Sequence, residues 1–256
     1  MPARSRALWF AAMGVYAFLY LPLLIVIVFS FNDSRLNARW TGFTLDWYAK
    51  LLGNQQLLTA AWNSLVIALA VTLISVLVGT IAGIALSRYR ARALSLLVVT
   101  PMAVPDILTG VSLLVFFVMI HLTLGMQSVI LAHVSFCISF VAIVVRSALT
   151  NLDPHLVEAA RDLGATPFIA FRKVVMPAIT PGIVAGALLA FTLSIDDFVI
   201  TFFTAGAGTT TLPLQVYSMI KVSITPEINA VSTLLMVMTL SLVVLASRLA
   251  PETIRT

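Results

Sequence analysis

Hydrophobic positions of this chain fall into six long stretches, and short polar segments separate them. Each stretch is close to the ~20 residues that a helix needs to cross the hydrocarbon core of a bilayer. A membrane β-barrel would show shorter segments in which apolar and polar positions alternate. The pattern therefore predicts an all-α fold, a polytopic membrane helix bundle in which each helix satisfies its own backbone hydrogen bonds. The six predicted transmembrane spans are residues 8–31, 60–86, 94–120, 126–149, 179–204 and 230–249.

The composition agrees with a membrane protein and excludes a soluble domain. Hydrophobic residues make up 61% of the chain and charged residues 10%, whereas soluble domains have about 25% charged residues. The first apolar stretch follows two arginines, as in a signal peptide. It is longer than the apolar region of a signal, and no cleavage site of small residues follows it, so we interpret it as an uncleaved span. The single cysteine, Cys137, excludes a disulfide within the chain.

The basic residues predict the orientation of the bundle. With the N-terminus in the cytoplasm, 11 of the 15 basic residues fall in inner segments and 4 in outer segments. Cytoplasmic loops are enriched in lysine and arginine, so we predict that both termini are cytoplasmic. Because the basic residues do not cluster, no nucleic-acid partner is expected. The inner set is Arg4, Arg6, Arg88, Arg90, Arg92, Arg146, Arg161, Arg172, Lys173, Arg248 and Arg255, and the outer set is Arg35, Arg39, Lys50 and Lys221.

The first predicted outer loop, residues 32–59, is rich in aromatic side chains. This composition suits an interfacial aromatic belt with a short helix lying on the membrane. It also suits a docking surface for an external partner, and both descriptions can hold. The aromatic residues concerned are Trp40, Phe43, Trp47 and Tyr48.

The second predicted outer loop, residues 205–229, contains residues that prevent a continuous helix. These are Gly206, Gly208 and Pro213. The following LQVYSMIKV segment has its apolar positions on one helical face, and a further helix is expected to begin at Pro226. A broken loop of this kind fits an external contact, a lining of a path through the membrane or a plain connector.

The predicted cytoplasmic loop, residues 153–177, carries charges that the apolar stretches lack. Asp153 and Pro154 suit the N-cap and first residue of a short helix, which Gly164 ends. Thr166 caps a second short helix, which begins at Pro167 and is expected to stop at Pro177. The apolar face of the first helix consists of Leu156, Val157, Ala160 and Leu163, and that of the second of Phe168, Phe171 and Val175.

This loop has two interpretations from its pattern alone. A short helix with an apolar face can fill a groove on a partner protein. An amphipathic hairpin at the membrane surface could equally do no more than connect the fourth and fifth spans.

The same loop resembles the EAA loop of ABC-importer permeases. That motif is Glu-Ala-Ala, then three residues, glycine, nine residues and an Ile-x-Leu-Pro ending; Val174 and Met176 depart from it here but stay apolar. The resemblance implies a coupling helix seated in a cleft of a cytosolic ATPase, with Glu158 the residue most exposed to that partner. The residues assigned to ATPase coupling are Glu158, Ala159, Ala160, Arg161, Asp162, Gly164 and Pro177.

The chain contains no G-x-x-x-x-G-K-[S/T] phosphate loop, so it is not expected to bind ATP itself. We therefore predict a transport subunit rather than an enzyme. No cofactor is expected in this chain, and ATP and Mg would be bound by the partner ATPase.

Nearly the whole chain resembles the spermidine/putrescine permeases, and in particular the C-type permease of the pair. The likeness rests on four stretches: residues 191–203, 211–230, 40–52 and 105–107. It implies polyamine uptake across the bacterial inner membrane. The implied partners are a second permease subunit, two copies of a cytosolic ATPase and an external substrate-binding protein. The implied organisation is a first span with an outer loop (1–59), a permease core (60–249) and a short cytoplasmic tail (250–256).

Three acidic residues fall inside predicted spans: Asp106, Asp196 and Asp197. A carboxylate in the bilayer interior costs at least ~2.5 kcal/mol, so such residues usually face a pathway or a partner. Counted along their helices, Asp106 and Asp196 lie at similar depths of about 18 and 21 Å. Carboxylates at these depths would bind the ammonium groups of a polyamine, and Tyr217 could add a cation–π contact.

Other roles for these acids remain open. Asp196 and Asp197 are about 100° apart on an unbroken helix, so they would not both face one space. One of them could cap a broken helix, and Asp106 could bond backbone amides freed by Pro105. His121 and His133 lack metal-ligand spacing, and we interpret both as structural.

Two rival functions remain compatible with the sequence. The same importer class could carry another cargo, such as a cation, a ferric ion or a small organic molecule, although three membrane acids disfavour an anion. Alternatively, a proton-coupled secondary exchanger could use the aspartates as a relay, and it would not need residues 153–177. A membrane enzyme is disfavoured because no paired metal ligands or nucleophile elbow occur in the spans.

Overall fold

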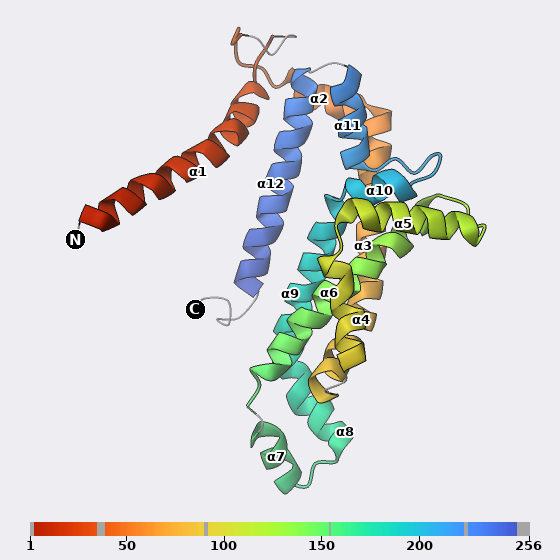
Figure 1. Cartoon of the computed structure of the whole chain (residues 1–256). Helices are drawn as coiled ribbons and strands as arrows, with labels where there is room; N and C mark the ends of the chain where they lie inside the picture. The colour runs from red at the N-terminus through yellow and green to blue at the C-terminus, as the bar shows by residue number, and fades with distance from the viewer. Residues whose placement is uncertain (1–2, 35–38, 90–91, 154, 223–224, 250–256) are drawn as a thin grey trace. The chain divides into compact units, whose positions relative to one another are not determined.

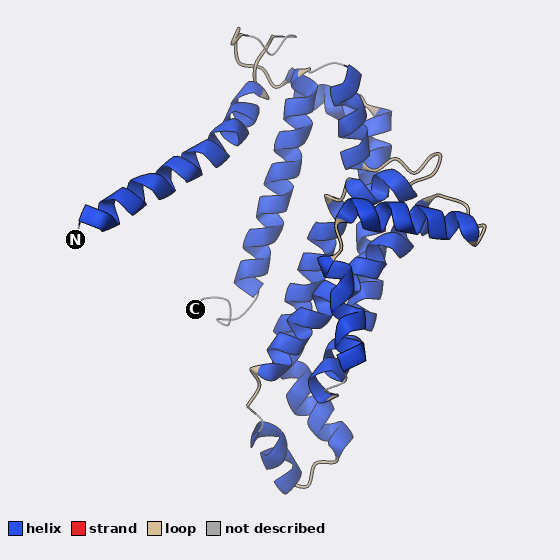
Figure 2. Ribbon diagram, viewed as in Figure 1, coloured by secondary structure: helices blue, strands red, loops and turns tan. Residues whose placement is uncertain are grey.

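The structure, a computed structural model, describes residues 3–34, 39–89, 92–153, 155–222 and 225–249. Within these ranges the regular elements are all helical (Figure 2), apart from one isolated antiparallel bridge between Asn32 and Phe43. This confirms the predicted all-α class. By its packing the chain divides into two units, Met1–Leu58 with Gln215–Met238, and Thr59–Leu214 with Thr239–Thr256.

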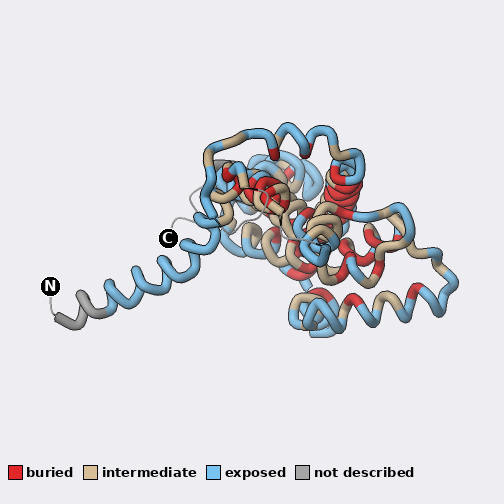
Figure 3. Tube along the Cα trace, turned by 90° about the horizontal axis from the view of Figure 1, so that it is seen from above, coloured by how far each residue is buried: buried red, intermediate tan, exposed pale blue. Residues whose placement is uncertain are grey.

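The first unit contains α1 (Ala3–Phe29) and α2 (Asp46–Gly53). It also contains most of α11 (Leu212–Val222) and the first half of α12 (Pro226–Leu249). Figure 3 shows the helix that leads from the N-terminus exposed over most of its length, and residues 8–25 are all exposed. Such a surface suits lipid or another membrane subunit. Two local predictions are confirmed, because α11 covers the whole LQVYSMIKV segment and α12 begins at Pro226.

Asn32 organises the aromatic loop of this unit, which was predicted to lie on the outer side. Its Oδ1 accepts a hydrogen bond from the Thr41 N–H (2.9 Å), and its Nδ2 donates to the Arg39 carbonyl (2.8 Å). Its own carbonyl accepts from the indole Nε1 of Trp47 (2.7 Å), which is buried. The predicted short helix is present as α2, and part of the aromatic set packs inside the loop.

The second unit is built around α6 (Met126–Thr150). Figure 1 shows α9 (Met176–Ile195) running beside it, with α4 (Arg92–Ala103) on another side. The buried cluster at the centre joins α6 and α9 to α3 (Gln55–Arg88), and a smaller cluster around Val98 joins α4 to α3 and α6. Its fully buried members include Ile67, Val71, Val141, Val145 and Ile179.

Glycines let these helices approach α6 closely. A Cβ on Gly79 would lie 2.7 Å from the Val141 Cβ, and one on Gly83 would lie 2.7 Å from the Ala142 carbonyl oxygen. On α9, a Cβ on Gly182 would meet the Ala148 Cβ at 2.6 Å. Close contact through small residues is the usual way in which helices associate in a membrane, where no water is available to drive burial.

Among the described residues, five helices are long and apolar enough to cross a membrane. They are Leu8–Phe29, Gln55–Arg88, Met126–Thr150, Pro167–Ile195 and Pro226–Val244. A sixth candidate is α4 together with α5 (Asp106–Met119), a pair bent by 107°. The span predicted over 94–120 is therefore present as a bent pair of helices, with its break before Pro105 and with Pro101 inside α4. Proline removes a helix N–H and collides with the preceding turn, and the helix stops just before Pro105.

The predicted fifth span, 179–204, is also interrupted. Helix α9 ends at Ile195, and α10 (Val199–Thr204) begins after three non-helical residues. The break falls at the two adjacent aspartates rather than at a glycine or proline. The predicted division into first span, permease core and tail is a functional one and stays a prediction.

Candidate functional site

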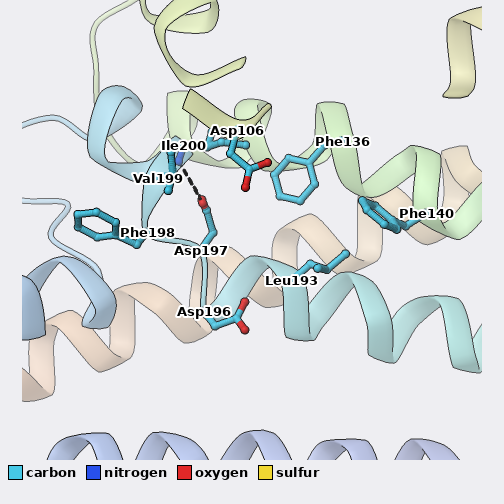
Figure 4. A pocket seen from close by; sticks show the side chains of 9 residues that line it. All are labelled: Asp106, Phe136, Phe140, Leu193, Asp196, Asp197, Phe198, Val199 and Ile200. Atoms are coloured by element: carbon cyan, nitrogen blue, oxygen red, sulfur yellow. Dashed lines mark hydrogen bonds between the residues drawn. The ribbon is translucent and has the colours of Figure 1, made fainter. Parts of the chain in front are cut away.

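The three membrane aspartates line one pocket of the second unit. Its volume is about 410 Å³. Asp106 comes from the first turn of α5, Asp196 from the end of α9 and Asp197 from the break that follows (Figure 4). The other lining residues are Phe136, Phe140, Leu193, Phe198, Val199 and Ile200.

Asp197 caps the start of α10. Its two carboxylate oxygens accept the Ile200 N–H at 3.0 and 3.2 Å, the contact drawn in Figure 4, and its side chain is 9% exposed. The predicted alternative in which an aspartate caps a broken helix is therefore confirmed for Asp197. The residue before α5 is Pro105, which has no side chain that could cap the helix, and the alternative in which Asp106 bonds amides near Pro105 stays a prediction.

The expectation that Asp196 and Asp197 would face different spaces is wrong. It assumed a continuous helix, with about 100° between neighbours. Asp196 instead is the last helical-type residue, with φ −100° and ψ 0°, and the chain then leaves the helix. Both residues consequently line the same pocket.

The lining favours a cation. Three of its nine residues are acidic, three are phenylalanines, and none of these described residues is basic. Carboxylates make strong charge-assisted hydrogen bonds to ammonium groups, and aromatic faces attract cations. No group of three or more His, Cys, Asp or Glu side chains that could hold a metal ion occurs in the described part of the chain.

His133, interpreted from the sequence as structural, is a buried polar residue beside this pocket, and its contacts there were not predicted. The ring nitrogens of His133 lie 2.9 Å from the hydroxyls of Ser194 and Thr201, and its Nε2 lies 3.8 Å from Asp197 Oδ1. One signal for it was present in the sequence. A lone titratable ring within an apolar stretch is costly and marks a site by default.

Tyr217, the fourth predicted path residue, lies on α11 in the first unit. The Nζ of Lys221 lies over the Tyr217 ring, 4.6 Å from its centroid. The aspartates belong to the other unit, and the place of Tyr217 on a transport path stays a prediction.

The loop at 153–177 forms the two short helices that its caps predict. The Asp153 carboxylate accepts the His155 N–H at 2.9 Å, at the start of α7 (His155–Asp162). Thr166 accepts the Ile169 N–H at 3.4 Å and caps α8 (Pro167–Ala170). The predicted role of Pro154 as first helical residue lies outside the described residues.

Gly164 ends α7 in the way that its position predicts. It has φ +84°, and the N–H groups of Gly164 and Ala165 donate to the carbonyls of Arg161 and Ala160, at 2.9 and 3.0 Å. This pair of bonds is a Schellman motif, which needs a residue in the left-handed region. Glycine adopts that conformation without strain.

The prediction that Pro177 stops the second helix is wrong. Residues Phe171–Val175 form a π-helical turn after α8, and the chain passes from it directly into α9, with Pro177 in its first turn. Proline is tolerated there because the widened turn, in which the Met176 N–H reaches the Phe171 carbonyl, relieves the collision of its ring with the preceding carbonyl.

The two predicted apolar faces are divided between the core and the surface. Val157, Phe171 and Val175 belong to the central cluster or pack on it, whereas Leu163 is 90% and Phe168 70% exposed. Glu158 is 70% exposed, and its carboxylate contacts the ring of His155 at 3.0 Å. The loop thus leaves large apolar side chains and an acidic one uncovered beside small Ala159.

Comparison with known proteins gives three findings. Residues 75–251 match the family described as binding-protein-dependent transport system inner membrane component. The chain is 42% identical over 242 residues to the spermidine/putrescine transport system permease protein PotC of Escherichia coli K12, covering 93% of this chain and 92% of that protein. It is 41% identical over 231 residues to the putrescine transport system permease protein PotI of the same organism, covering 86% and 82%.

A likeness of fold accompanies these similarities of sequence. The chain is similar to a subunit of a bacterial alginate ABC transporter in complex with an alginate pentasaccharide-bound periplasmic protein. The TM-score is 0.70 and the identity 15%, covering 97% of this chain and 96% of that one. At this identity the likeness concerns the fold alone.

Proposed function

Because the chain belongs to the family of binding-protein-dependent transport system inner membrane components, we propose that it is the permease subunit of an ATP-driven importer of polyamines. The name of the relative PotC includes spermidine and putrescine, and the name of the relative PotI includes putrescine. The observation that carries the cargo assignment is the acidic pocket. A polyamine is a flexible chain of ammonium groups, and it would find three carboxylates and no described basic side chain there.

The three aspartates have distinct parts in this proposal. Asp196 and Asp106 are exposed in the pocket and would meet the ammonium groups directly. Asp197 gives part of its acceptor capacity to the Ile200 N–H and would present the rest to the cargo. The phenylalanines would pack on the methylene segments between the charges.

The implied assembly contains a second permease subunit, two copies of a cytosolic ATPase and an extracytoplasmic binding protein that delivers the substrate. ATP and Mg would be held by the ATPase, because this chain lacks a phosphate loop. Both termini and the loop at 153–177 would lie in the cytoplasm, as the positive-inside rule predicts.

The loop at 153–177 would couple this chain to ATP hydrolysis by the ATPase. Its exposed Glu158, with Leu163 and Phe168, would enter a cleft of the ATPase as a short helix in a groove. Alongside Glu158, the residues proposed for this contact are Ala159, Ala160, Arg161, Asp162, Gly164 and Pro177.

Helix α9 would carry a displacement from this loop to the pocket. Its 20 residues extend about 30 Å, and Asp196 lies at its far end. Figure 1 shows α7 and α8 at one end of the second unit, with α10 toward the other.

The test is uptake of labelled putrescine and spermidine by vesicles that contain the complete transporter, with and without ATP. We expect ATP-dependent uptake, strongly reduced by Asp196→Asn and by Asp197→Asn, while both variants insert normally. ATP-dependent uptake of another cargo with no polyamine uptake would contradict the cargo assignment. Unchanged uptake in both variants would contradict the role of the pocket.

A further inference from the structure

His133 is fully buried in the first half of α6, and both of its ring nitrogens have a polar partner. Nδ1 lies 2.9 Å from the Ser194 hydroxyl and Nε2 lies 2.9 Å from the Thr201 hydroxyl. Ser194 and Thr201 are themselves buried. A polar ring at this depth is expensive unless every polar atom has a partner, and here each has one.

The two partners of His133 stand on opposite sides of the interrupted helix. Ser194 lies in the last turn of α9, and Thr201 lies in the first turn of α10. Residues 196–198 between them are not helical. One side chain from a neighbouring helix therefore ties both ends of the break together.

The hydrogen bonds around Thr201 also determine which group is donor and which is acceptor in this series of side chains. Its hydroxyl donates to the Asp197 carbonyl (3.3 Å), so its oxygen accepts from the Nε2–H of His133. In the neutral ring the other nitrogen is an acceptor, and Ser194 then donates to Nδ1. Donation thus runs from Ser194 through His133 and Thr201 to the backbone of Asp197.

We propose that His133 is a positioning residue for transport, which bridges the break through Ser194 and Thr201 and so directs the Asp197 carboxylate into the pocket. It lies 3.8 Å from Asp197 Oδ1 and does not line the pocket itself. Its effect on cargo therefore passes through Asp197. This inference rests on the proposed role of the pocket aspartates.

The geometry predicts which replacement retains the function. The amide of glutamine reaches about as far as Nε2 of histidine, and that of asparagine about as far as Nδ1. His133→Gln keeps the contact to Thr201 and hence to Asp197, whereas His133→Asn keeps only the contact to Ser194. We expect His133→Asn and His133→Leu to lower the uptake of putrescine per ATP hydrolysed about tenfold, and His133→Gln to stay near the parent.

The experiment measures putrescine uptake and ATP hydrolysis together in proteoliposomes that hold the complete transporter. A role in folding alone would reduce the amount of assembled complex and lower both activities in parallel, which would overturn the proposal. Thr201→Val and Thr201→Ser form a second pair, differing in the hydroxyl, and only Thr201→Val should lower uptake per ATP. Ser135→Ala, which removes a hydroxyl that donates within α6 to the Ala132 carbonyl (2.6 Å), is the matched control.

Asp197→Asn separates this proposal from the proposed function. If Asp197→Asn lowers uptake per ATP but His133→Asn does not, His133 has no positioning role and the pocket assignment stands. If Asp197→Asn has no effect, the pocket assignment fails first. We expect His133→Asn to add little to the loss in an Asp197→Asn background, because both act on the same carboxylate.

Discussion

At the scale of single residues, glycines set the distance between α6 and its neighbours. Gly79 and Gly83 on α3 and Gly182 on α9 all face side chains or backbone of α6 at distances that no Cβ could tolerate. The neighbour of Gly83 is a backbone oxygen, which cannot move aside without moving its helix. These positions are therefore more sensitive than their small side chains suggest.

We predict that Gly83→Ala destabilises the folded protein by about 1–3 kcal/mol, because the added methyl must push α3 away from the Ala142 carbonyl. The measurement is thermal unfolding of the purified protein in detergent. Gly14→Ala is the control, since nothing lies within 4 Å of its added Cβ and alanine favours a helix. Equal stability of the two variants would show that α3 does not pack against α6 in this way.

The aspartates show both the reach and the limit of sequence reasoning at this scale. Their presence in apolar stretches predicted a site, because an unpaired carboxylate is costly there. That Asp196 and Asp197 share one pocket could not be predicted, since no glycine or proline marks the break after Ile195. The break is held by contacts from α6, in particular His133, and these depend on the tertiary fold.

At the scale of elements, short helices were predictable wherever local chemistry ends them. Asp153, Gly164 and Thr166 act within a few residues of their own position, so the sequence alone locates α7 and α8. The prediction that Pro177 ends the second helix was wrong because the effect of a proline depends on the turn before it, and that turn is π-helical here. The angle of the bend at Pro105 likewise could not be predicted from the sequence, although a proline marks its position.

Charge reversal on α7 tests the coupling element. We predict that Glu158→Lys abolishes ATP-dependent uptake while the protein still inserts, because the side chain is 70% exposed and supports little of the fold. The measurement is uptake in vesicles, with the amount of inserted protein determined by immunoblot.

His155→Ala is the matched control for that variant. It removes the His155 contact of the Glu158 carboxylate, and an exposed pair of this kind contributes only about 0–1 kcal/mol. Uptake should therefore stay near the parent. A loss of uptake in His155→Ala equal to that in Glu158→Lys would place the importance of Glu158 inside the chain rather than at a partner.

At the scale of the whole molecule, the family and fold leave two energy sources to distinguish. An importer driven by ATP needs the exposed loop, whereas a proton-coupled exchanger would need only the membrane acids. We predict that proteoliposomes with the complete transporter and ATP continue putrescine uptake after an uncoupler collapses the proton gradient. Uptake that stops with the uncoupler and persists without ATP would favour the exchanger.

The wide turn at Phe171–Val175 has a rotational consequence. It holds one more residue than an α-helical turn, and each residue advances a helix by about 100°. An ordinary turn would swing Ile179 and Gly186 away from α6 and carry Asp196 around with them. This turn thus determines the rotation of α9 about its axis relative to the exposed loop. A single inserted or deleted residue there would leave the loop and the pocket residues unchanged in sequence, but it would rotate one about the helix axis relative to the other.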